Sequence, residues 1–418
     1  MSKQRRFWAL VSLIVAGELI FSLPFHVPRY FRPSLLEAFN LTNTTLGDIF
    51  AVYGITAILA YFPGGILADR FDPKRLIIVS LFLTAIGGIY FSTIPNTFNL
   101  GILYGYWGFT TIFLFWAGLM RATRAWGGDT SQGKAFGFLD GGRGLIAAIF
   151  ASVGVWLFSS VLPTTDLIEV AERKAALTIV ILSYSLATAM AAILVLICLP
   201  NQNRRNVADS MPKNILITVL SRPIIWLKAL IIFCAYCGYK GLDNYGLYVH
   251  EVLRVSEIES AKFMAYMAFL RPIAAVLAGF LADRFLASRV IKWSFLLSSA
   301  GYIGNIIING QMALANVIFL TLVITFLTVF ALRGVYFALL AETQTPARLT
   351  GTTVGIISVI GYSPDIFFSP LAGRILDAFP GAEGYTYYFS LLTLISLTGL
   401  LTTIVLIKKK SSKDEHEK

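Results

Sequence analysis

Hydrophobic residues occur along the chain in long runs, each separated from the next by a short polar or charged segment. A hydrocarbon core of about 30 Å requires roughly 20 consecutive apolar residues in a helix, and the runs are of this length. The pattern predicts twelve membrane-spanning helices, at 7–30, 46–68, 76–94, 100–122, 135–160, 176–199, 223–249, 260–282, 290–308, 314–340, 352–375 and 386–407.

The distribution of Lys and Arg predicts the orientation of these helices. Most of the 34 basic residues lie at the termini, in the even-numbered loops and in the central loop. By the positive-inside rule, both termini then face the cytoplasm. The first run lacks a small-residue cleavage site, so we interpret it as a retained helix of a multi-pass inner-membrane protein. The formal charge of +11 reflects this topology, and nucleic-acid binding is not needed to explain it.

The composition is that of a polytopic membrane protein, with 56% hydrophobic and 14% charged residues. The three cysteines, Cys198, Cys234 and Cys237, lie in apolar runs and are too few for a disulfide framework or a tetrahedral metal site. The chain contains no nucleotide-binding loop, nucleophile elbow or zinc-protease motif in a suitable context. We therefore expect no enzymatic activity, no cofactor and no metal, and transport that is not driven by ATP.

Two sequence motifs recur in the second half of the chain. GGILADRF at 64–71 returns as AGFLADRF at 278–285, changed only at its first and third positions, and GKAFG at 133–137 is echoed by GTTVG at 351–355. The repeats indicate a duplicated six-helix unit. We predict an N-terminal bundle at 1–199, a cytoplasmic linker at 200–222, a C-terminal bundle at 223–407 and a cytoplasmic tail at 408–418.

The segment GGILADRFDPKR resembles the signature loop between helices 2 and 3 of the major facilitator superfamily. With its second copy and the 6+6 layout, the resemblance covers nearly the whole chain. It implies an all-α membrane fold of two pseudo-symmetric six-helix bundles, with a central site and one half rocking against the other. It also implies that residues of both copies form a cytoplasmic interlock: Gly65, Asp69, Arg70, Asp283 and Arg284. A purely structural role explains the four charged residues as well, because helix ends and acid–base pairing favour them.

A narrower resemblance runs through RATRAWGGDTSQGKAFGFLDGGRG at 121–144, GLDNYGLYVHEV at 241–252 and LLAETQTPARLTGTTVG at 339–355. These segments are similar to the organophosphate/phosphate antiporters and, more loosely, to the nitrate/nitrite porters. The resemblance implies anion transport and places Arg143 where glycerol-phosphate carriers have a substrate-binding histidine. The chain departs from that family at Gly238, where the carriers have an arginine, so phosphate esters are only one of the anions expected.

Arg143 and Arg271 fall near the middle of predicted spans, where a charge costs on the order of 2.5–3.5 kcal/mol. Arg271 has no carboxylate one turn away, so its partner must come from another helix or from a ligand. Because a guanidinium group grips a carboxylate, phosphate or sulfonate through paired hydrogen bonds, we predict that the two arginines bind one anion from opposite halves. Alternatively, Arg143 pairs with Asp140, three residues before it.

Three further polar residues of the second half are candidate substrate ligands. Tyr236 and Lys240 share a helix face with Asp243 at i, i+4, i+7 spacing, although an internal Lys240–Asp243 pair explains the pattern equally well. Arg333 is also predicted to lie inside a span, and Glu342 is too far along the helix to pair with it.

Four acidic residues within predicted spans are candidate proton carriers: Glu18, Asp140, Asp243 and Asp365. A carboxylate inside a membrane can take up a proton at one face and release it at the other. For Glu18, a hydrogen bond to a neighbouring helix is the alternative. The sequence SPDIFFSP predicts a helix break that exposes Asp365, and we interpret His26, among several prolines, as part of a kinked end of the first helix.

Together these features predict a secondary transporter that moves a small organic anion, coupled to protons or to a counter-anion. The expected partners are this anion and the lipid bilayer, with no nucleic acid, and the protein is expected to function as a monomer. The alternatives are a transporter-like receptor that senses such an anion, and an amino-acid or drug carrier of the same superfamily.

Overall fold

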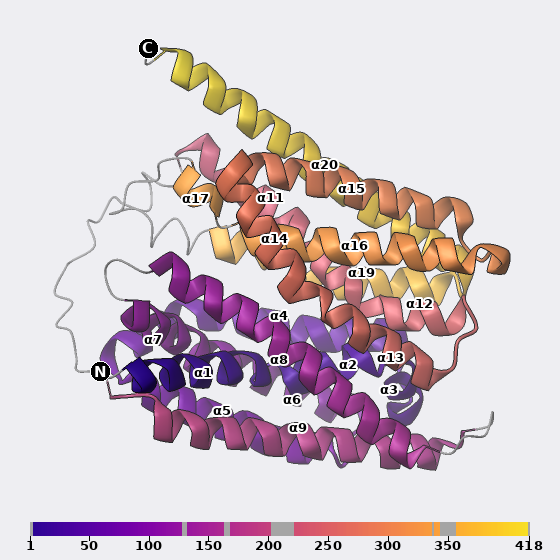
Figure 1. Ribbon diagram of the computed structural model, residues 1–418. Coiled ribbons are helices and arrows are strands. Elements are labelled where there is room, and N and C mark those ends of the chain that lie inside the picture. The colour runs from indigo at the N-terminus through magenta and orange to yellow at the C-terminus, as the bar shows by residue number, and fades with distance from the viewer. Residues whose placement is uncertain are drawn as a thin grey trace. The chain divides into compact units, whose positions relative to one another are not determined.

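The computed structural model describes residues 3–127, 132–162, 168–201, 221–336, 338–342 and 357–416, and every regular element in these ranges is a helix (Figure 1). The chain divides into two compact units. The first comprises Met1–Val207, Asp243–Pro272 and Asp365–Asp377, and the second comprises Ala208–Leu242, Ile273–Pro364 and Ala378–Lys418. Most of the predicted linker, 200–222, lies outside the described residues, so the division into two bundles at that point stays a prediction.

The first unit contains α1 (Lys3–Leu19), η1 (Ser22–His26), α2 (Val27–Tyr30), α3 (Arg32–Phe39), α4 (Asn43–Arg70), α5 (Pro73–Phe91), α6 (Thr97–Gly108), η2 (Phe109–Trp116), α7 (Ala117–Gly127), α8 (Gln132–Val161), α9 (Val170–Cys198), α12 (Tyr245–Glu251), α13 (Glu257–Ala268) and all but the end residues of α19 (Pro364–Ala378). The second contains α11 (Pro223–Gly241), most of α14 (Leu270–Phe285), α15 (Ala287–Ile308), η4 (Met312–Leu314), α16 (Ala315–Val335), α17 (Ala338–Glu342) and α20 (Ala382–His416). The short η3 (Leu242–Asn244) and α14 continue from one unit into the other.

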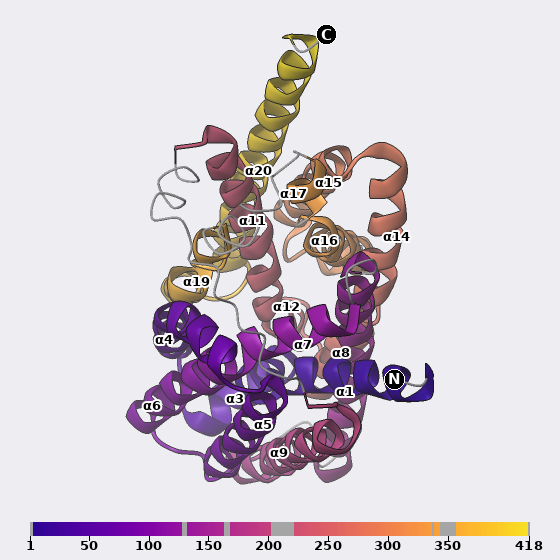
Figure 2. The same cartoon turned by 90° about the vertical axis from the view of Figure 1, so that its left-hand side faces the viewer.

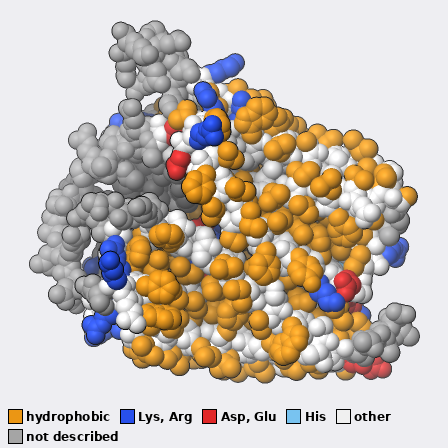
Figure 3. All heavy atoms as spheres, in the orientation of Figure 1, with side chains coloured by type: hydrophobic (Ala, Val, Ile, Leu, Met, Phe, Trp, Pro, Cys, Tyr) orange, Lys and Arg blue, Asp and Glu red, His pale blue; other side chains and the backbone are white. Residues whose placement is uncertain are grey.

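Ten described helical stretches are long and apolar enough to cross a membrane, and the bent pair Lys3–Leu19 and Ser22–Tyr30 makes eleven. Each overlaps one of the predicted spans. The remaining prediction, 352–375, lies partly outside the described residues, and α19 forms its second part. Hydrophobic side chains are spread widely over the described part of the face seen in Figure 3, as contact with lipid requires. The all-α membrane fold predicted from the sequence is confirmed.

Several spans are interrupted, and proline accounts for two of the breaks. Pro24 lies within the π-helical η1, where the two parts of the first span meet at 41°. A one-residue break at Phe269 separates α13 from α14. Pro272 accounts for this break, because its ring crowds the carbonyl four residues earlier and it has no N–H to donate. The break predicted from SPDIFFSP is found at Tyr362 and Ser363, directly before α19.

Both copies of the repeated motif end one helix and lead into the next. In the first copy, α4 ends at Arg70, and Asp72 caps α5 by accepting a hydrogen bond from the backbone N–H of Lys74 at 3.1 Å. In the second copy, α14 ends at Phe285 and α15 begins two residues later, after Leu286 with φ of +76°.

Packing inside each unit joins helices that are far apart in the sequence. In the first unit, α1 packs against α8 and α9, and α8 also packs against α13. In the second unit, α15 packs against α16 and α20, and Gly399 of α20 is needed because a Cβ there would lie 2.5 Å from the ring of Phe295. The α8–α13 contact matters for function, since it brings the region before Arg271 next to the helix that carries Arg143.

Candidate functional site

Glu18 lies at the centre of a buried polar cluster in the first unit. Its side chain is 2% exposed and is the next-to-last residue of α1. The chain turns at Ile20 and Phe21 before η1 begins, and this turn brings His26 back onto Glu18, with Nε2 3.3 Å from Oε1. In a straight helix, eight residues would separate the two by about 12 Å along the axis. The kink expected near His26 is therefore present, and it places the imidazole in the cluster.

Arg143 reaches the same carboxylate from α8. Its Nε donates to Oε2 of Glu18 at 3.0 Å, and its guanidinium carbon lies 5.7 Å from the ring centre of Phe21 and 5.9 Å from that of Trp116. A side chain at Gly17 would place a Cβ 3.2 Å from Cδ of Arg143, so this glycine leaves room for the arginine. The alternative in which Arg143 pairs with Asp140 is thus replaced by a contact between helices, which spacing along α8 could not reveal.

Arg271 completes the cluster from the start of α14. Its Nη1 donates to Oε1 of Glu18 at 2.8 Å, and its Nη2 lies 3.5 Å from Oδ1 of Asp140. A Cβ on Gly144 would lie 3.1 Å from Cγ of Arg271, so the absence of a side chain leaves room for Arg271 beside α8. The expectation that Arg271 finds its partner on another helix is correct.

The cluster contains two guanidinium and two carboxylate groups, so it is neutral when Glu18 and Asp140 are ionised and His26 is not protonated. Each arginine holds a different oxygen of Glu18 through a charge-assisted hydrogen bond, which is stronger than a bond between neutral groups. Removing one partner from such a buried pair typically costs about 3–5 kcal/mol, because the other charge is left uncompensated.

A second buried pair in the first unit joins Arg29 of α2 to Asp243 of η3. The Arg29 Nε lies 2.5 Å from Asp243 Oδ1, and both side chains are less than 10% exposed. Sequence reasoning missed Arg29, although its place at the end of an apolar run signals a charge inside the span. The contact also differs from the internal Lys240–Asp243 pair considered as an alternative; Lys240 is itself buried in the second unit.

Further polar contacts in the first unit, together with this pair, form what we call the gate network. Arg32 donates to Asn43, which in turn donates to Asp377 through Nδ2 at 3.2 Å. Glu257 accepts from Ser34 and forms a 2.7 Å ion pair with Arg173. Arg374 and Asp48 form an exposed pair at 2.8 Å. The network links residues 29–48 and Arg173 to residues 243–257 and 374–377, all within the first unit.

In the second unit, Arg333 and Tyr236 belong to an aromatic group. The Arg333 guanidinium lies over the ring of Tyr239 at 3.9 Å, Tyr236 contacts the rings of Tyr239 and Tyr362, and Tyr336 and Tyr362 share a 3.1 Å hydrogen bond between their hydroxyls. Glu342 bonds the backbone N–H of Ser288 at 2.8 Å. Two predicted ligands, Arg333 and Tyr236, are therefore brought into one group.

The predicted interlock residues lie at the ends of α4 and α14. Arg70, Asp283 and Arg284 are exposed there, and Gly65 has open space where a Cβ would be. The side chain of Asp69 and the motif GTTVG lie outside the described residues. Asp365, the remaining candidate proton carrier, is half-buried in the first turn of α19.

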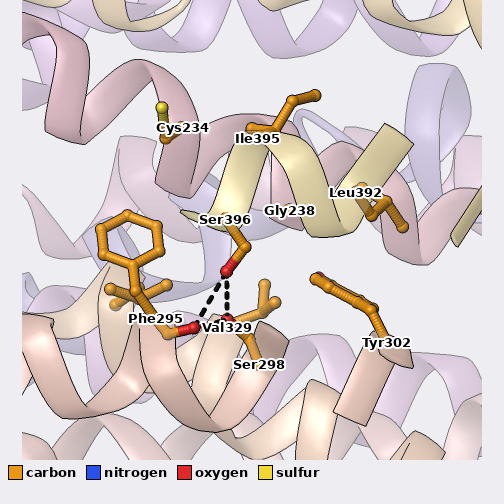
Figure 4. Close-up of a pocket in the computed structure, with 10 residues that line it drawn as sticks. Cys234, Gly238, Phe295, Ser298, Tyr302, Val329, Leu392, Ile395 and Ser396 are labelled. Carbon is orange, nitrogen blue, oxygen red and sulfur yellow. Dashed lines mark hydrogen bonds between the residues drawn. The ribbon is translucent and has the colours of Figure 1, made fainter. Parts of the chain in front are cut away.

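A cavity in the second unit is too small to serve as a substrate site. It holds about 10 Å³, room for about one water molecule, and is lined by Cys234, Phe295, Ser298, Tyr302 and Ser396 among others (Figure 4). The hydroxyls of Ser298 and Ser396 are 2.7 Å apart, and the Ser396 hydroxyl also lies 3.1 Å from the carbonyl oxygen of Phe295, as the dashed lines in Figure 4 mark.

The apolar helices and the buried, charge-balanced cluster define a multi-pass membrane protein with a polar site inside its span. The sequence matches the Major Facilitator Superfamily over residues 7–369, and the chain belongs to this family of transporters. The expectation drawn from GGILADRFDPKR is confirmed at the level of the superfamily. The narrower resemblance to anion antiporters stays a prediction.

Relatives and solved structures cover nearly the whole chain. The inner membrane protein YqcE of Escherichia coli (strain K12) is 28% identical over 393 residues, which covers 91% of this chain and 90% of that protein. The inner membrane protein YihN of the same organism is 26% identical over 423 residues, covering 97% and 96%. A bacterial homologue of the human lysosomal transporter Spinster, in an inward-facing and unoccupied conformation, has 15% identity and a TM-score of 0.75, covering 98% of this chain and 99% of that chain. A mutant of the nucleoside transporter NupG has 10% identity and a TM-score of 0.73, covering 96% and 99%. These structural likenesses concern the fold.

Proposed function

We propose that this protein carries a small organic anion across the cytoplasmic membrane by proton-coupled secondary transport. The proposal rests on one observation, the contact of Arg143 and Arg271 with opposite oxygens of the buried Glu18 carboxylate. Two guanidinium groups that hold an internal carboxylate can hold the carboxylate, phosphate or sulfonate of a ligand in the same way.

In this proposal, the substrate anion replaces Glu18 between the two arginines. Glu18 can leave only if its charge is neutralised, because an ionised carboxylate without a partner is costly inside a membrane. Uptake of one proton by Glu18 leaves a net charge of +1 on the cluster, which one monoanion then neutralises. Proton and anion would therefore enter together, and His26, 3.3 Å from Glu18, offers a route for the proton.

Several other features support a transport cycle. The interlock residues at 65–70 and 283–284 lie at one end of the predicted spans, and the gate network lies at the other. The positive-inside rule assigns these ends to opposite membrane faces. We propose that they close these two faces alternately as the protein changes state. The names of YqcE and YihN support placement in an inner membrane. The distribution of Lys and Arg supports an orientation with both termini in the cytoplasm. Arg333, Tyr236 and Lys240 are proposed to contact the rest of the substrate.

The test is a binding screen of the purified protein against carboxylates, phosphate esters, sulfonates and amino acids by thermal shift, followed by uptake of each hit into proteoliposomes. We expect an organic anion to bind and to be transported, and Arg143→Gln and Arg271→Gln to weaken its binding. Arg6→Gln is the matched control, since this exposed arginine lies over Trp126 and not near Glu18. Binding that both cluster variants retain would disprove the site, and binding without flux would identify a receptor.

A further inference from the structure

A large groove lies in the second unit between α14, α15 and α16, which are neighbours in both Figure 1 and Figure 2. It has a volume of about 630 Å³ and is lined by residues between 274 and 285 of α14, 289 and 297 of α15, and 327 and 331 of α16. We call it the α14–α16 groove. It is separate from the Glu18 cluster, whose residues belong to the first unit.

The walls of the groove are apolar along almost their whole length. Leu277, Leu281 and Leu297 line it and remain about half exposed, whereas Ala274 and Ala278 are buried and small, so they leave space between the helices. Its polar members are Arg289, Ser294 and Thr328. Such a surface lies within spans whose outer faces meet lipid tails, so an acyl chain is the occupant that matches its walls.

One end of the groove is basic and aromatic. Arg289 lines it at the start of α15, the Lys292 amine lies 4.8 Å from the ring centre of Trp293, and the Arg284 guanidinium lies 5.2 Å from that of Phe285. Two acidic residues, Asp283 and Glu342, are close to these cations in sequence or space. Asp283 directly precedes Arg284, and Glu342 accepts hydrogen bonds from the backbone N–H and the hydroxyl of Ser288. Three cations thus outnumber two acids at the point where the apolar groove ends.

We propose that the α14–α16 groove binds one anionic phospholipid, with an acyl chain between the helices and the phosphate held by Arg289, Lys292 and Arg284. Basic side chains where transmembrane helices meet the cytoplasmic face bind anionic lipid head groups, and tryptophan favours the same depth in the membrane. The loop between α14 and α15 is even-numbered in the predicted topology, so it faces the leaflet in which these lipids attract basic residues. A soluble anion would meet the cations but would leave the groove unfilled.

The test is native mass spectrometry of the full-length protein with phosphatidylglycerol, with phosphatidylcholine of the same acyl chains, and with glycerol phosphate. We expect one phosphatidylglycerol to bind more tightly than phosphatidylcholine. Arg289→Gln with Lys292→Gln should lower its affinity about 30-fold, since each basic side chain near the membrane surface contributes about 1 kcal/mol. Lys408→Gln with Lys409→Gln, at the exposed end of α20, removes the same charge elsewhere and should leave binding unchanged.

A second variant separates the groove from the charge. Leu281→Trp fills the groove from a partly exposed position while keeping all three cations, and it should also weaken phosphatidylglycerol binding. Gel filtration and thermal unfolding establish that each variant is folded before binding is compared. Equal binding of the two lipids, undiminished binding in the Arg289/Lys292 or Leu281 variants, or displacement of the lipid by equimolar glycerol phosphate would each overturn the proposal. None of these results depends on the Glu18 cluster or on substrate.

Discussion

Arg143 and Arg271 bind opposite oxygens of the same carboxylate. They lie 125 and 253 positions after Glu18, so 128 positions of sequence separate the two arginines. Arg143 holds Oε2 of Glu18 through Nε, and Arg271 holds Oε1 through Nη1. The pair meets at Glu18 because a turn ends α1, a proline interrupts the span of Arg271, and glycines at 17 and 144 leave room for both side chains. This geometry predicts how the site responds to substitution.

Substitution of Arg143 tests the substrate clamp directly. We expect Arg143→Lys to weaken binding of the transported anion, because lysine keeps the charge but loses the planar pair of donors. Arg143→Gln should weaken it further, by about 30-fold to several-thousand-fold, since truncating a desolvated charged contact costs about 2–5 kcal/mol. Isothermal titration calorimetry of folded variants measures both effects.

The same experiment extends to the second arginine. Two residues that share one ligand are coupled, so Arg143→Gln with Arg271→Gln should bind little worse than the weaker of the single variants. Asp140→Asn should impair folding less than Arg143→Gln does, because Asp140 is partly exposed and contacts Arg271 at 3.5 Å. Full additivity in the double variant would mean that the two arginines do not share one ligand. Affinity near that of the wild type in both single variants would mean that these charges only support the architecture.

Substitution of Glu18 tests the coupling to protons. Glu18→Gln removes the group that we propose to carry the proton that moves together with the substrate, so accumulation driven by a pH gradient should be abolished. Counterflow of substrate against substrate needs no net proton movement and should remain. Proteoliposomes with an imposed pH gradient measure both activities. If accumulation persists with an unchanged pH profile, the proton is carried by Asp365 or Asp140, or the protein exchanges one anion for another.

The Arg29–Asp243 pair should contribute strongly to stability. Arg29→Gln leaves the Asp243 carboxylate buried without this partner, and such losses typically cost about 3–5 kcal/mol. Asp243→Asn in the same chain should restore part of the stability, because it removes the charge left behind. Lys262→Gln, which breaks the exposed Lys262–Glu259 pair, is the control and should change little. Thermal unfolding in detergent measures all four proteins, and equal effects of Arg29→Gln and Lys262→Gln would contradict the expectation.

Asp69 of the signature motif is predicted to act on the balance between conformations. Asp69→Asn should therefore slow transport and leave the affinity for substrate largely intact. Initial rates of uptake and equilibrium binding, measured on the same preparation, separate the two quantities. Loss of binding with an unaltered rate of conformational exchange would place Asp69 in the substrate site instead.

The sequence predicted the helices well because lipid imposes one strong rule, a long apolar run in which backbone groups bond internally. The span predicted at 135–160 corresponds to α8 at Gln132–Val161, for example. Partnerships between spans were not predictable in the same way. Nothing in the local pattern around Glu18 indicates Arg271, and the contact of His26 with Glu18 depends on a turn that periodicity does not reveal. Arg29 was missed because it lies near the end of a run, where a long basic side chain can also extend to the membrane surface.

The long sequence separation within the Glu18 cluster also has a consequence for how the protein is made. Glu18 enters the membrane with the first span, whereas Arg271 is added 253 residues later, which takes roughly 10–50 s at cellular rates of translation. During that interval the nascent chain contains a buried acid whose full set of partners has not yet been synthesised. A chain that stops in the linker would keep Glu18 and Arg143 but would never obtain Arg271. Such a fragment should be a substrate for membrane quality control. Supplying the second half should protect it, even when that half is a separate polypeptide.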